Sequence, residues 1–169
     1  MKIMFIKLHS SNLLAATIVA CALVTAPAFA VEAGHHHHEQ AAAPATLSLD
    51  AADKKWTTDA PLRKAMTNIR NAMAKSLHAI HEDKLAAAGY ARLARKINGE
   101  VAYMVSNCKL EAQADAHLHL VIADLLAAAA AMEGKAKEMT RRDGAIKVVG
   151  ALDSYGKYFD DPDWKPIEH

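Results

Sequence analysis

The chain has 169 residues, with 20 Lys and Arg against 19 Asp and Glu, so its formal charge at neutral pH is +1. This near-balance argues against a nucleic-acid partner, because binding to phosphates needs a surplus of basic side chains on one face. The length fits one domain with a tail.

The first thirty residues have the features of a secretory signal peptide. Lys2 and Lys7 precede an apolar run over residues 13–24, and Ala28-Phe29-Ala30 has the A-x-A form of a cleavage site. We therefore expect an exported, periplasmic protein whose mature chain begins near Val31. The alternative is a lipoprotein attached through Cys21, because Ile18-Val19-Ala20-Cys21 loosely resembles a lipoprotein processing site.

Residues 31–56 are predicted to form a flexible leader that contains four consecutive histidines, His35, His36, His37 and His38. Adjacent imidazoles bind Ni(II), Cu(II) or Zn(II), and the Irving–Williams order favours copper. Glu39 would add an oxygen ligand. The alternative is a solubilising tract with no specific role.

Residues 57–160 carry four amphipathic segments with apolar residues spaced three and four apart, which predicts helices. The first runs over 59–82, with Thr58 or Asp59 as its cap and Pro61 in its first turn. The others run over 88–107, 112–133 and 143–159, the last capped by Asp143. No run alternates as a strand does. Short connections predict an all-α fold, an antiparallel four-helix bundle, followed by a tail over 161–169.

A membrane span is not expected once the signal peptide is removed. The longest remaining apolar run, Leu118 to Met132, is interrupted by Asp124 and is shorter than the roughly 20 residues that a span needs.

His78 and His81 lie three residues apart, so on a helix both project from one face and are candidate ligands for one ion, with Glu82 as a third. Their spacing does not fit a zinc-protease motif. The alternative is that the negative end of the helix dipole favours histidines in the last turn.

Cys108 and His117 form the third candidate site, because the end of the second helix and the start of the third should lie together. Two residues turn a helix by about 200°, so His117 and His119 cannot both point at one ion, and His117 shares the apolar stripe. With Met66 and Met104 nearby, thiolate, thioether and imidazole together suit Cu(I) or zinc. The alternative is that Cys108 is a small buried apolar residue.

The architecture resembles that of periplasmic four-helix cytochromes, the cytochrome c-prime and soluble b-type group. That resemblance implies a haem, which in the b-type proteins is held without covalent bonds, here by Met66 and His117. Covalent haem needs Cys-x-x-Cys-His, and Cys108 is followed by Lys109 and Leu110 instead. The segments 107–110 and 114–117 are also similar to uncharacterised exported bacterial proteins.

The sequence therefore favours a non-enzymatic periplasmic protein that buffers or senses copper, zinc or nickel. A non-covalent haem protein and a structural or chaperone-like helical adaptor are the alternatives. Cys108 lacks the flanking motif of a catalytic nucleophile, and the sequence names no protein partner.

Overall fold

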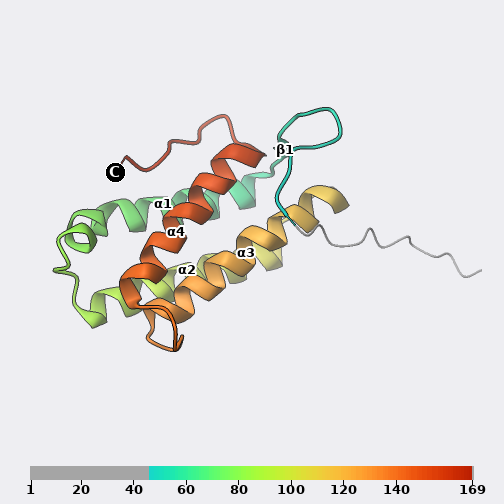
Figure 1. The fold of residues 1–169 in the computed structure, drawn as a ribbon. Helices are drawn as coiled ribbons and strands as arrows, with labels where there is room; N and C mark the ends of the chain where they lie inside the picture. The colour runs from blue at the N-terminus through green and yellow to red at the C-terminus, as the bar shows by residue number, and fades with distance from the viewer. Residues whose placement is uncertain (1–45, 169) are drawn as a thin grey trace, which may run out of the picture. The chain divides into compact units, whose positions relative to one another are not determined.

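A computed structural model describes residues 46–168, which form four helices joined by short connections (Figure 1). Consecutive helices pack together and run in opposite directions, so the predicted all-α four-helix bundle is confirmed. Each helix boundary lies within two residues of its predicted position. The helices are α1 Ala60–His81, α2 Ala87–Asn107, α3 Ala112–Met132 and α4 Arg141–Tyr158. The predicted signal peptide and the histidine tract lie outside the described residues.

α1 begins at the predicted cap. The Asp59 side chain accepts a hydrogen bond from the Leu62 amide at 2.9 Å, and Pro61 occupies the first turn, where no amide hydrogen is needed. Behind the cap, Leu62, Met66, Ile69 and Met73 are fully buried at the predicted spacing. The apolar stripe therefore fixes which face of α1 meets the other helices.

α4 begins two residues earlier than predicted, and its cap is Thr140 rather than Asp143. The Thr140 hydroxyl accepts from the Asp143 amide at 3.1 Å, while the Asp143 carboxylate accepts from the Thr140 amide at 3.2 Å. This reciprocal pair is a capping box. The capping box also explains the depressed pKa of Asp143, whose charged form accepts hydrogen bonds from the Thr140 hydroxyl and amide. Asp143 thus stabilises the helix start from its third position.

Small residues bring α3 and α4 close together. A Cβ atom at Gly144 would lie 2.8 Å from the carbonyl oxygen of Ala128 and 2.9 Å from the Cβ of Ala131. Only glycine fits at this crossing, and the alanine-rich end of α3 supplies the matching surface. Gly134, with φ of +80°, follows α3 as the predicted stop.

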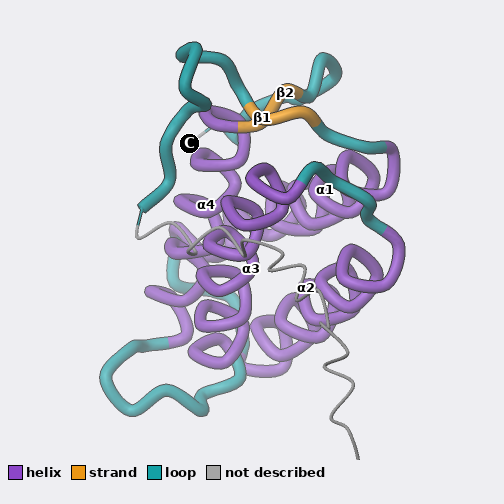
Figure 2. Tube along the Cα trace, turned by 90° about the vertical axis from the view of Figure 1, so that its right-hand side faces the viewer, coloured by secondary structure: helices purple, strands orange, loops and turns teal. Residues whose placement is uncertain are grey.

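Two short strands join the segment before α1 to the segment after α4 (Figure 2). β1, Trp56–Thr57, pairs in parallel with β2, Phe159–Asp160. The sequence predicted no strand, because a two-residue strand has no alternation to detect. We call this end of the bundle, where β1, the start of α1 and the α2–α3 connection meet, the strand end.

α3 is the one helix among residues 46–168 that is long and apolar enough to cross a membrane. Half of its most apolar stretch is buried inside the bundle, and core helices of soluble proteins pass the same test. Asp124, which interrupts this stretch, forms an ion pair with Lys147 of α4. The absence of a membrane span stays a prediction.

Candidate functional site

Asp59 holds the strand end together with both of its carboxylate oxygens. Oδ1 caps α1, and Oδ2 accepts from the Lys109 amide at 2.7 Å. One side chain therefore links the start of α1 to the connection between α2 and α3. This link fixes the position of Cys108, the residue directly before Lys109.

Cys108 directly follows α2 as its C-cap residue and is half-buried, with a free thiol. Burial raises the pKa of this thiol to about 12, and the charge of Asp59, a hydrogen bond to Asp59 and the charge of Asp115 act in the same direction. The side chain is consequently a neutral thiol at physiological pH. Its surroundings oppose a free thiolate and favour a positive charge beside the sulfur.

A small hollow of about 180 Å³ adjoins Cys108 between α2 and α3. Met104, Asp115 and His119 line it together with Cys108. His119 Nδ1 lies 2.9 Å from the carbonyl oxygen of Asp115 and 3.4 Å from its carboxylate. The sequence predicted that His117 lies beside Cys108, whereas in the structure His119 lines the hollow with Cys108.

His117 points inward, as its position on the stripe predicts, and is only 6% exposed. Its ring stacks on Trp56 with centroids 4.6 Å apart and planes 23° apart. Nδ1 is buried and has no hydrogen-bond partner among the described residues. Burial lowers the pKa of His117, so the imidazole is neutral at pH 7 and packs beneath β1.

His78 and His81, predicted to share one ion, have different surroundings. His78 Nε2 lies 3.1 Å from Glu82 Oε2 in an exposed pair, and Lys84 Nζ contacts the same oxygen at 3.2 Å. His81 instead lines a groove between α1 and α4. Glu82, the predicted third ligand, is thus already paired with His78 and with a lysine.

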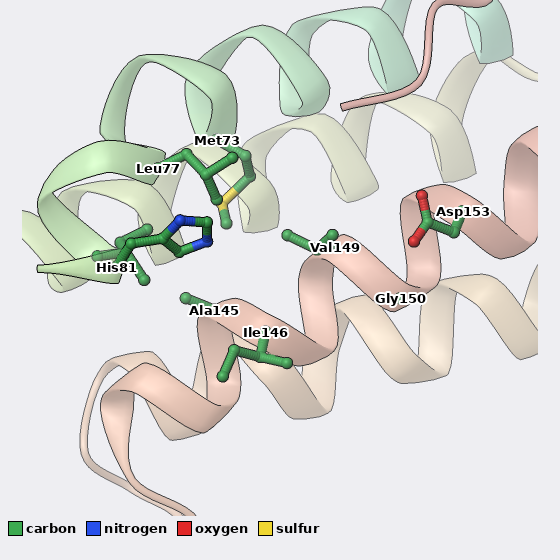
Figure 3. A pocket seen from close by; sticks show the side chains of 9 residues that line it. Met73, Leu77, His81, Ala145, Ile146, Val149, Gly150 and Asp153 are labelled. Carbon is green, nitrogen blue, oxygen red and sulfur yellow. The ribbon is translucent and has the colours of Figure 1, made fainter. Parts of the chain in front are cut away.

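The groove between α1 and α4 measures about 380 Å³ and has mainly apolar walls. Figure 3 shows the Met73 thioether and the His81 ring on the α1 side, with Ala145 and Val149 facing them from α4. Contacts between α1 and α4 are sparse compared with those between consecutive helices. The size of this groove is within the range of small-molecule sites.

The aromatic side chains at the strand end close the core. The Tyr155 hydroxyl donates to Asp161 Oδ2 at 2.9 Å, and Trp164 packs edge-on against the Tyr155 ring at 4.7 Å. Burial and the Asp161 charge raise the pKa of Tyr155 far above its usual range. Met66, the predicted haem ligand, is fully buried in the core.

Within residues 46–168, no group of three or more His, Cys, Asp and Glu side chains is arranged to hold a metal ion. His35–His38 lie outside this range, so the structure does not describe the main predicted metal site. Among the described candidates, Cys108 has donor side chains beside it in its hollow, which His78, His81 and His117 do not line.

Sequence reasoning missed His119 and the groove. The i, i+4 spacings of Met104 with Cys108 and of Asp115 with His119 were available signals, because such residues share a helix face. The chain matches no known protein family, no curated protein and no solved structure. The likeness to periplasmic cytochromes therefore stays a prediction.

Proposed function

We propose that this chain is an exported, non-enzymatic protein that binds copper, zinc or nickel outside the cytoplasm and buffers or senses it. The observation that carries the proposal is the run His35–His38 with Glu39, directly after the predicted signal peptide. Four adjacent imidazoles and a carboxylate form a donor set for these ions. A leader of the flexible kind that the sequence predicts loses conformational entropy on binding, so we expect a moderate affinity.

The test is a metal titration of the full exported chain, purified without an added tag. Cu(II), Ni(II) and Zn(II) are added separately, and bound metal is measured after dialysis. The matched variant replaces His35–His38 by asparagine, which keeps the segment polar and of similar size. We expect at least one Cu(II) per chain at micromolar concentration and its loss in the variant. Equal binding by both proteins, or by neither, would refute the proposal.

A non-covalent haem protein is the second candidate, and the observation favouring it is the groove rather than the predicted pair Met66 and His117. His81 would supply one imidazole ligand to the iron, and Met73 and Val149 would supply apolar contacts to the haem. Haem titration of the parent and of His81→Gln tests this candidate. A Soret shift in the parent that is lost in the variant supports it, and an unchanged spectrum removes it.

A further inference from the structure

Two sulfur atoms and one imidazole line the hollow at the strand end. Met104 and Cys108 are one helical turn apart at the end of α2, and His119 faces them from α3. Thiolate and imidazole suit both zinc and Cu(I), and the added thioether favours Cu(I), because zinc sites are built from Cys, His and carboxylate ligands. Hard-ligand ions such as Mg²⁺ or Ca²⁺ would find too few oxygen ligands in the same place.

The Nδ1 atom of His119 is directed at the backbone of its own helix, so Nε2 is the ring nitrogen that is available to a metal ion. A carbonyl oxygen only accepts hydrogen bonds, so the ring must donate from Nδ1 to the Asp115 carbonyl at 2.9 Å. In the neutral ring that donates from Nδ1, the lone pair is on Nε2. Metal-binding histidines commonly donate their other nitrogen to a backbone carbonyl or a carboxylate in this way.

The charges around the hollow favour a cation. The Asp115 side chain lines the hollow, and Asp59 Oδ2 accepts from the Lys109 amide directly beside Cys108, so two carboxylates lie near the site and attract a cation. Capture of the ion breaks the Cys108 S–H bond, forms a sulfur–metal bond and releases one proton to solvent, with no change in oxidation state.

We infer that Met104, Cys108 and His119 form a Cu(I) site in the folded part of the chain, distinct from the histidine tract. The inference rests on the proposed metal-binding function and deepens it by adding a second site, which prefers Cu(I) where the histidine tract prefers divalent ions. The site contains only two members of the His, Cys, Asp and Glu set, so it is not a group of the kind that is absent from residues 46–168. Its third donor is a methionine, and Cu(I) accepts low coordination numbers.

The experiment uses the full exported chain in which His35–His38 are replaced by asparagine, so that only the folded part binds. Cu(I) is supplied without oxygen, in competition with a chromogenic Cu(I) chelator. We expect one retained Cu(I) per chain, with an ultraviolet thiolate-to-copper charge-transfer band. Cys108→Ser should abolish the band and weaken binding more than about 10-fold, the loss that even outer ligand-supporting groups cause.

Two further variants keep the test independent of the cysteine. His119→Gln and Met104→Leu should each weaken Cu(I) binding, whereas His78→Gln and Met66→Leu, which change a histidine and a buried methionine elsewhere, should not. Helix content by circular dichroism checks that each variant is folded. Cu(I) binding that is absent, or equal in Cys108→Ser and its parent, overturns the inference. The proposal that the histidine tract binds metal is tested separately, by the binding of Cu(II) and Ni(II) to the unmodified chain.

Discussion

The two seams of α4 differ sharply although they belong to the same helix. On the α3 side, a Cβ atom at Gly144 would overlap the backbone of α3 at 2.8 Å. Six residues later, a Cβ atom at Gly150, which lines the groove toward α1, would meet nothing within 4 Å. One seam is closed to the limit of atomic contact, and the other leaves about 380 Å³ open.

The contrast shows how small residues distribute space in a bundle. Gly144, Ala128 and Ala131 let α3 and α4 approach closely, and the dispersion energy of that contact favours the approach. On the opposite seam, Met73 and Val149 face each other across a groove that they do not fill. Binding of a small molecule is therefore expected at the α1–α4 seam and not at the α3–α4 seam.

The largest expected effect concerns side chains of α4 that differ in burial. Leu152 is 1% exposed, so Leu152→Ala should lower the free energy of unfolding by about 2–5 kcal/mol through lost burial and a residual cavity. Ile146 borders the groove and is 53% exposed, so Ile146→Ala should change it by less than about 0.5 kcal/mol. Urea denaturation measures both. A similar loss for both variants would show that the groove is closed in solution.

The next largest effects concern Gly144 and Gly150, whose replacement by alanine should change the free energy of unfolding in opposite directions. Gly144→Ala should destabilise the protein by about 1–3 kcal/mol, because the new methyl group is forced against the α3 backbone. Gly150→Ala should stabilise it by about 0.5–1 kcal/mol, because alanine is the better helix former and the space is free. Thermal unfolding of the pair distinguishes the seams directly. Stabilisation by both substitutions would contradict the close contact of α3 with α4.

The polar contacts at the two ends of α1, made by Asp59 and Glu82, should also differ in their effect on stability. Asp59→Ala removes the helix cap and the acceptor of the Lys109 amide, and should cost about 1–2 kcal/mol. At the other end, Glu82 forms exposed pairs with His78 and Lys84, so Glu82→Ala should cost at most about 1 kcal/mol. Denaturant midpoints provide the measurement, and equal losses would refute the linking role of Asp59.

Asp59→Ala should also change the chemistry of Cys108. The charge and hydrogen bond of Asp59 both raise the thiol pKa, so the variant thiol ionises at lower pH. Because the thiolate is the reactive form, iodoacetamide should alkylate Cys108 faster in the variant at pH 8. Comparison under native conditions with Glu82→Ala, whose rate should match that of the parent, separates this effect from general loosening.

The sequence predicted the helices well because their apolar stripes are long and regular, as in Leu62, Met66 and Ile69 of α1. It also predicted correctly that His117 faces inward, because the angular position of a residue around its own helix follows from its spacing in the sequence. The neighbour of Cys108 depends instead on how α2 crosses α3, which no single-helix pattern contains. The same is true of the groove, because spacing identifies an apolar face but not the seam that stays open. Asp143 was predicted as a cap because the capping box uses both a threonine and an aspartate.

The smallest effect we expect is the pH dependence that arises at His117. Burial lowers its pKa in the folded protein below the ordinary value of 6.5, so on acidification the unfolded chain binds the proton first. The contribution of this group to the free energy of unfolding is therefore at its maximum above pH 6.5 and declines as the pH falls toward the folded-state pKa.

His117→Phe keeps an aromatic ring on Trp56 and should show a shallower decline of the free energy of unfolding between pH 7.5 and 5.5. His119→Gln, an exposed control, should follow the parent. If His117→Phe follows the parent as well, protonation of the buried imidazole is not the cause of the acid destabilisation.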